Sequence, residues 1–217
     1  MDAQDLPPND PGPPDPDQEG RDRLADAVSA EAVFSGFSQA ALAAASQSLN
    51  LPRGEAERLF PDGPLDVLAY VSARADARTV DSLEKMGVDQ MKIRDRIRAA
   101  VRLRIETHGD AKEAVRRGLA QLALPLNAPL GLKLLYRTVD AIWYAAGDTS
   151  SDFNFYTKRA TLAGVFSSTL LYWLNDRSEG NAATWEFLDR RIDDVMRFEK
   201  FKAQAKNWSP RKAATRR

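Results

Sequence analysis

The chain of 217 residues contains no cysteine and a single histidine, His108. Disulfides, zinc–thiolate sites and cysteine nucleophiles are therefore excluded. One histidine offers one candidate base for a serine triad, and the motifs GxSxG, HExxH, Glu-x-x-His, GxxxxGK[ST] and GxGxxG are absent. We therefore expect a protein that is not an enzyme, with no catalytic residue, cofactor site or metal site. For His108 we expect a solvated side chain near a helix end.

The sequence also lacks a long apolar run and a basic, apolar leader at its N-terminus. Lysine plus arginine and aspartate plus glutamate are balanced at 31 each, so the net charge indicates no class of partner. These features predict a cytoplasmic protein, or one that lies on a membrane surface.

Composition divides the chain into a short tail and a long helical part. Residues 1–20 hold six prolines, six acids and no base, which predicts a disordered acidic tail. From Arg21 onward Ala, Leu, Arg and Glu dominate and no run alternates with period two, which indicates an all-α protein. The helices are expected at about 21–34, 38–49, 52–60, 65–86, 89–107, 110–122, 130–146, 152–174 and 184–206.

The lengths of these helices suggest three folded parts. Residues 21–64 have the proportions of a helix-turn-helix-like three-helix unit, and residues 65–200 form a larger helical bundle. Residues 201–217 form an amphipathic basic segment. The bases between Lys92 and Arg104 are expected to form a solvated helix face.

The N-terminal pattern resembles the TetR family of regulators. It rests on Gly36-Phe37-Ser38 after the first helix, the alanine-rich stretch ALAAASQSLNL, and ERLFPDGPL at the end of the third helix. The resemblance implies a TetR-like fold. Between Arg21 and Asp76, however, eight acids outnumber five bases, so a phosphate backbone should be repelled. We expect no nucleic-acid partner; a TetR-type, lipid-responsive transcriptional regulator is the alternative.

The helix expected at 152–174 is apolar on two faces, one with Phe153 and Tyr156 and another with Phe155 and Phe166. Such a helix is buried on two sides. One side fits the core, and the other fits a ligand pocket or a subunit interface. A homodimer is the expected assembly.

A long motif before and within this helix is the most specific feature of the sequence. Its members are Trp143, Tyr144, Ala146, Gly147, Asp148, Ser150, Asp152, Phe153, Asn154, Tyr156, Thr157, Arg159 and Ala160. Together with LALPLNAPLGLKLL before it and TWEFLDRRIDDVM after it, the motif resembles the lipid-binding accessory protein family of ubiquinone biosynthesis. The resemblance covers residues 122–201.

This resemblance implies a non-catalytic protein that binds an isoprenoid or quinone-type lipid inside the bundle. It also implies that the protein presents the lipid to the di-iron hydroxylase that acts on demethoxyubiquinone. We place the lipid contacts at Leu132, Leu135, Trp143 and Phe166. For Trp143, an ordinary core position is the competing interpretation.

The family's patch for its partner enzyme maps onto Ile142, Asp152, Phe155, Tyr156 and Arg159. Phe155 stands where the family commonly has tryptophan, so it keeps an aromatic face and loses an N–H donor. Aromatic residues with an arginine are typical of interface hot spots. Ordinary core packing of the aromatics remains the alternative for each position.

The C-terminal segment predicts a contact with a membrane. Between Lys200 and Arg217 there are seven bases and no acid, and aromatic residues recur on one helical face. This pattern is typical of an interfacial helix on anionic lipid, with a solvated tail docked on the bundle as the alternative. The expected contacts are Phe198, Phe201, Lys202 and Trp208. They predict a peripheral protein at the inner face of a bacterial membrane.

Overall fold

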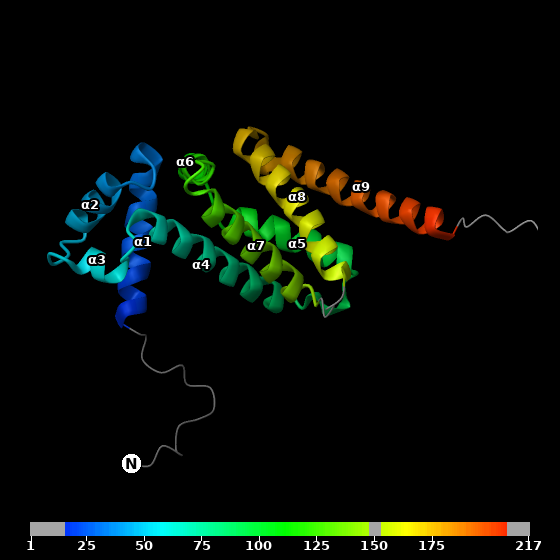
Figure 1. Cartoon of the computed structure of the whole chain (residues 1–217), viewed down its shortest axis with the longest axis horizontal. Helices are drawn as coiled ribbons and strands as arrows, with labels where there is room; N and C mark the ends of the chain where they lie inside the picture. The colour runs from blue at the N-terminus through cyan, green and yellow to red at the C-terminus, as the bar shows by residue number, and fades with distance from the viewer. Residues whose placement is uncertain (1–15, 148–152, 208–217) are drawn as a thin grey trace, which may run out of the picture. The chain divides into compact units, whose positions relative to one another are not determined.

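The computed structural model describes residues 16–147 and 153–207, and every regular element within these ranges is a helix (Figure 1). The α-helices are α1 (Pro16–Ser35), α2 (Gln39–Ser48), α3 (Glu55–Leu59), α4 (Pro64–Lys85), α5 (Ile93–Glu106), α6 (Lys112–Leu122), α7 (Ala128–Ala145), α8 (Phe153–Asn175) and α9 (Ala182–Asn207). Two short 3-10 helices, η1 (Val88–Gln90) and η2 (Glu179–Asn181), precede α5 and α9. The all-α class predicted from composition is confirmed.

The chain divides into two compact units. Unit 1 comprises Met1–Arg74 and Asp110–Gly131, and unit 2 comprises Ala75–Gly109 and Leu132–Arg217. Unit 1 is larger than the three-helix unit expected over residues 21–64, because it also contains α6 and the first part of α4.

Helix α1 begins at Pro16, five residues before the predicted start at Arg21. Proline suits the first position of a helix, and Asp17 and Glu19 in the first turn favour the positive end of the helix dipole. The prediction of disorder is therefore wrong for residues 16–20. Residues 1–15 of the expected tail lie outside the described residues.

The helix-turn-helix-like part of unit 1 is built from α1, α2 and α3. Gly36 ends α1 with a φ of 68°, and the Ser38 hydroxyl caps α2 by accepting the Ala41 N–H at 3.2 Å. Between α2 and α3, Asn50 adopts a φ of 51°. The core of the unit is formed by Leu24, Ala25, Val28, Ala32, Phe37, Ala41, Leu42, Ala45, Ala56, Leu59, Phe60, Val67 and Ala114.

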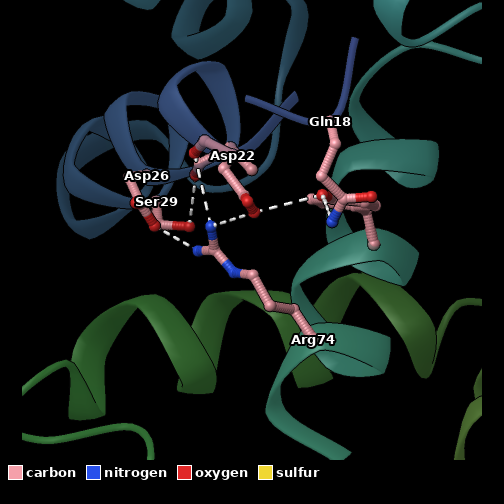
Figure 2. Close-up of polar contacts among 7 residues, drawn as sticks. Gln18, Asp22, Asp26, Ser29 and Arg74 are labelled. Carbon is pink, nitrogen blue, oxygen red and sulfur yellow. Dashed lines mark hydrogen bonds and ion pairs between the residues drawn. The ribbon is translucent and has the colours of Figure 1, made fainter. Parts of the chain in front are cut away.

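An ionic clamp joins α4 to α1 within unit 1 (Figure 2). The Arg74 guanidinium donates to the Asp22 carboxylate at 2.8 Å and also pairs with Asp26. The Tyr70 hydroxyl donates to Asp22 at 3.1 Å, and the Gln18 amide donates to Tyr70 at 3.2 Å. Because most of the Arg74 side chain is shielded from water, these bonds hold α4 in register against α1.

Unit 2 contains the larger core. Helix α9 packs along both α8 and α5, and α8 and α9 run side by side (Figure 1). The buried side chains of this core include Val101, Ile105, Leu134, Val139, Ile142, Phe166, Leu170, Trp173, Leu188 and Ile192. The unit thus positions the end of α7 and the start of α8, where the sequence motif lies.

Candidate functional site

The motif residues lie at the end of α7 and the start of α8, on either side of residues 148–152, which are outside the described residues. Two residues after the end of α7, Gly147 adopts a φ of 84°. The Arg96 guanidinium donates to the Ala146 carbonyl at 3.0 Å and to the Met91 carbonyl at 2.9 Å. Arg96 therefore satisfies a carbonyl that the end of α7 would otherwise leave without a partner.

Position 147 requires glycine for two reasons, its backbone conformation and the closeness of Arg96. A Cβ added there would lie 3.0 Å from Arg96 Nη1, and the positive φ disfavours any other side chain. We expect Gly147→Ala to lower the free energy of unfolding by about 1–2 kcal/mol. Gly164→Ala is the matched control, because a Cβ at Gly164 in α8 meets nothing within 4 Å. That control should stabilise the protein by up to about 1 kcal/mol in urea denaturation, and equal effects of the two changes would contradict the assignment.

An ion pair joins α8 to α7. Arg159 Nε and Nη2 both reach Asp140 Oδ1, at 2.7 and 2.6 Å. The Arg159 side chain is almost fully buried, while that of Asp140 is partly exposed. This arginine therefore positions the start of α8.

Trp143 in α7 lies near Lys158 in α8. The Lys158 ammonium sits 5.4 Å from the centroid of the Trp143 ring, within reach of a cation–π contact. The buried indole N–H of Trp143 has no acceptor among the described residues. A ligand carbonyl or hydroxyl could accept this hydrogen bond.

Two tyrosines give the site its exposed surface. Tyr144 in α7 is 75% exposed, and Tyr156 in α8 is 69% exposed. Tyrosines exposed to this degree can bury large aromatic area against a partner and keep a polar tip. Tyr144 belongs to the sequence motif but was not among the predicted contacts.

The five predicted partner contacts differ in how the structure presents them. Tyr156 is exposed, whereas Ile142 and Arg159 are buried in unit 2. Asp152 lies outside the described residues, and so does the side chain of Phe155, whose backbone is in α8. The partner role of all five stays a prediction; Ile142 and Arg159 can serve it by positioning their neighbours.

The four predicted lipid contacts differ in how the structure presents them, and none of them is among the residues that line the hollow described below. Leu132 is exposed, Leu135 and Trp143 are partly buried, and Phe166 is in the core. Unit 2 contains a small hollow. Its walls are Asp76, Thr79, Val80, Arg104, Thr138, Ala141 and Ile142. The hollow has no room even for a water molecule, so an isoprenoid lipid needs much more space than it provides.

A buried ionic cluster forms part of the wall of this hollow. Arg104 Nε donates to Asp76 Oδ1 at 2.6 Å, and the Thr138 hydroxyl donates to the same oxygen at 2.8 Å. Both charged side chains are almost fully buried. The expectation of a solvated basic face is therefore wrong for Arg104, and it is wrong for Arg96 as well, because both make internal hydrogen bonds.

His108 belongs to this cluster and is not the solvated residue that the sequence suggested. Arg104 Nη1 lies 2.9 Å from His108 Nε2, and the imidazole lies against Trp173 at a centroid distance of 5.9 Å. Arginine can only donate, so Nε2 accepts and the proton of the neutral ring is on Nδ1. Burial, together with the charge of Arg104, lowers the pKa of His108 to about 3.

This shift predicts a dependence of stability on pH. The unfolded chain takes up a proton on His108 below about pH 6.5, but the folded chain does so only near pH 3. Stability should therefore fall as pH falls through this window. In His108→Gln, which keeps an acceptor for Arg104, the melting temperature should fall less between pH 7 and pH 4.5. Equal slopes in the two proteins, measured by circular dichroism, would contradict the assignment.

The short helix α3 lies at the position of a recognition helix. Its one base, Arg58, is already paired with carboxylates. Arg58 donates to Glu55 at 2.8 and 2.9 Å and to Asp17 at 2.9 Å. Hydrogen bonds from Arg58 lower the pKa of both carboxyls, so these stay charged around it. A phosphate would have to compete with two carboxylates for this guanidinium.

Three of the predicted membrane contacts, Phe198, Phe201 and Lys202, fall within α9, but their side chains are outside the described part of the structure. Trp208 also lies outside it. Across the described ranges, no helix combines the length and apolar character that a membrane span requires. Within those ranges no cluster of acidic or histidine side chains could hold a metal ion.

The fold of the chain is of a known type. The structure is similar to that of the TetR transcriptional regulator from Nitrosomonas europaea, with a TM-score of 0.63 over 80% of this chain and 95% of that one. The sequences are 17% identical, so this likeness concerns the fold alone. The predicted TetR-like, all-α fold is confirmed.

The sequence of the site gives the narrower relationship. Residues 128–199, which include all of α7 and α8 and most of α9, match the model of the COQ9 family. The chain is 38% identical over 168 residues to the mitochondrial ubiquinone biosynthesis protein COQ9 of Rattus norvegicus. It is 35% identical to the same protein of Homo sapiens and 34% identical to COQ9-A of Xenopus laevis.

Each of these three alignments covers 74% of this chain and 54, 52 and 53% of the relative, in that order. The chain thus spans about half the length of the curated relatives it matches. The resemblance to the accessory family of ubiquinone biosynthesis is confirmed.

Proposed function

We infer that this protein is a non-catalytic accessory protein of ubiquinone biosynthesis. It binds an isoprenoid or quinone-type lipid and presents it to the di-iron hydroxylase that acts on demethoxyubiquinone. The observation that carries this proposal is the match of residues 128–199 to the COQ9 family, in a segment where α7 and α8 each hold one exposed tyrosine of the motif.

The hydroxylase contact is centred on Tyr144 and Tyr156. The ion pair between Arg159 and Asp140 fixes the start of α8, and the bond from Arg96 to Ala146 fixes the end of α7. A surface held in this way loses little conformational freedom when a partner binds, and exposed tyrosines are typical hot-spot residues. Asp152 and Phe155 complete the proposed contact.

The lipid enters unit 2 near Trp143 and Phe166, and Leu132 and Leu135 contribute further apolar contacts. The bundle must widen to admit it, because the hollow beside Arg104 is too small. The indole N–H of Trp143 supplies a donor that has no acceptor among the described residues and can orient a polar head group. The small residues Ala160 and Gly164 leave the outer face of α8 open for a second copy in a homodimer.

The protein works as a peripheral protein at the inner face of a bacterial membrane, reached through Phe198, Phe201, Lys202 and Trp208. The curated relatives carry mitochondrial names, and ubiquinone itself is a membrane lipid, so a membrane surface is the place where substrate and enzyme meet.

Two measurements test the function. Native mass spectrometry of gently purified protein should show co-purified isoprenoid or quinone lipid, and an empty protein would contradict lipid binding. A strain that lacks the gene should accumulate the demethoxy intermediate. Accumulation of an earlier intermediate instead would place the protein at a different step and reject the hydroxylase as its partner.

A lipid-responsive transcriptional regulator is the second candidate, favoured by the likeness of the fold to a TetR regulator. The engagement of Arg58 by Glu55 and Asp17 weighs against it. A gel-shift titration that shows specific binding to DNA, weakening steeply with salt, would favour the regulator. We expect no shift.

A further inference from the structure

A tight turn between α6 and α7 in unit 1 presents leucines to water. Leu126 at its tip is 91% exposed and Leu124 is 55% exposed, and Pro125 and Pro129 beside them are exposed as well. Large apolar side chains in such a position lose nothing by being covered, and they gain free energy when they leave water. The turn is therefore a candidate contact surface.

The turn is held rigidly in this conformation. The Leu124 carbonyl accepts the N–H groups of Asn127 and Ala128, each at 2.9 Å, and the Asn127 side chain donates to the Gln121 carbonyl at 2.9 Å. Gln121 in turn donates to the Phe37 carbonyl at 2.9 Å, which ties the turn to the rest of unit 1. The exposure of Leu126 is thus a property of a built turn.

Close packing between α6 and α7 also indicates that the turn is rigid. A Cβ added at Gly131 would lie 3.3 Å from Leu122 Cβ, so the first turn of α7 approaches the last turn of α6 very closely. A rigid tip can insert into another phase without first being ordered, which removes one of the costs of binding.

Charge indicates what covers the tip. From residue 114 to residue 139 the sequence contains no acid, while its bases are Arg116, Arg117, Lys133 and Arg137. Arg116 and Arg117 are exposed on α6, and Glu113 pairs with both, so the α6 cluster still carries a surplus of positive charge. In a chain whose charges balance overall, this stretch stands out as positive. Exposed leucines flanked by bases match an apolar interior beneath an anionic surface.

We propose that the α6–α7 turn inserts Leu124 and Leu126 into the interfacial region of an anionic lipid bilayer. Arg116 and Arg117 meet the lipid phosphates from the adjoining helix. The proposal adds a second membrane contact to the one assigned above to the C-terminal segment. It rests on the proposed function for its purpose, since a protein that handles a membrane lipid must be held at the bilayer, but its residues are separate and all lie in unit 1.

The absence of cysteine allows a direct test. Leu126→Cys in the full chain, labelled with an environment-sensitive fluorophore, should show a blue shift and brighter emission when vesicles containing phosphatidylglycerol are added. Vesicles of pure phosphatidylcholine should give a weaker response. Phe34→Cys is the matched control, because Phe34 is also a highly exposed (78%) apolar residue of unit 1 and lies outside the turn. Its label should not respond.

A second variant measures the contribution of the turn to binding. Leu124→Ser/Leu126→Ser should weaken partition onto the same vesicles by about tenfold or more in a flotation assay, and Phe34→Ser should leave it unchanged. Vesicle binding without a response of the label at position 126 would overturn the proposal while leaving the C-terminal contact intact. A response without vesicles that depends on protein concentration would also overturn it and would assign the turn to contact between copies of the chain.

Discussion

Replacing Asp76 with alanine should lower the free energy of unfolding of unit 2 by about 3–5 kcal/mol, because the change leaves the Arg104 guanidinium buried without its carboxylate. The Thr138 hydroxyl would lose its acceptor as well. The neutral His108 and the ring of Phe166, at 6.0 Å, also contact Arg104, and neither of these two groups carries a negative charge. This change is the most damaging single substitution that we expect in the described part of the chain.

Tryptophan fluorescence is the appropriate measurement, because the three tryptophans of the described residues, Trp143, Trp173 and Trp185, fall within unit 2. A urea titration followed by this signal therefore reports the unit in which the cluster lies. Arg74→Ala is the matched control: it breaks the ionic clamp of unit 1 and should move the tryptophan transition much less. An equal shift for both variants would show that the two units unfold together.

The double variant Asp76→Ala/Arg104→Met separates the buried charge from the loss of contacts. Removing both charges should recover most of the stability lost in the single variant, because no unpaired ion then remains in the core. If the double variant were less stable than Asp76→Ala alone, the ion pair would contribute through its hydrogen bonds more than through charge balance.

The helices themselves were largely predictable from local signals. Prolines and glycines mark their ends, so the predicted bounds of α2, α4, α7 and α8 agree with the structure to within two residues. The early start of α1 was missed because the composition of residues 1–20 argued for disorder, whereas Pro16 and two acids are also a good first helical turn. At residues 16–20 the signals for a first helical turn therefore outweighed a composition that favours disorder.

The sequence contained a signal for the ionic cluster, because two charged residues stand on otherwise apolar or buried helix faces. Arg104 follows Ile97, Ala100 and Val101 on the apolar stripe of α5, and a charge in such a position has to be paired. Asp76 likewise shares a buried face of α4 with Thr79 and Leu83. Helical periodicity could therefore indicate that both residues are buried. Only the packing of α4 against α5 and α7 shows that they pair.

The same limit applies to the candidate site. The motif identified the exposed Tyr156 directly, because a long and specific pattern transfers position by position. It could not show that Ile142 and Arg159 are buried, because burial depends on how α7 and α8 face the rest of unit 2. A shared motif therefore contains exposed and buried residues together, and the structure separates them.

Tyr156→Ala should weaken binding to the proposed di-iron hydroxylase by about 30-fold or more, which corresponds to a loss of at least about 2 kcal/mol. The side chain is exposed in the free protein, so its removal leaves no cavity in the core, and the fold should be unchanged by circular dichroism. The loss should therefore appear in the affinity for the partner and not in stability.

Tyr136→Ala is the matched control for this measurement, since Tyr136 is another exposed tyrosine of α7 that lies outside the motif. Its affinity for the hydroxylase, measured by biolayer interferometry, should stay within a factor of two or so of the parent protein. Tyr144→Ala should lower the affinity for the hydroxylase as Tyr156→Ala does, if the two tyrosines form one contact. Equal affinities for the Tyr136 and Tyr156 variants would remove this face from the interface, because an anchor buried against the partner cannot be truncated without cost.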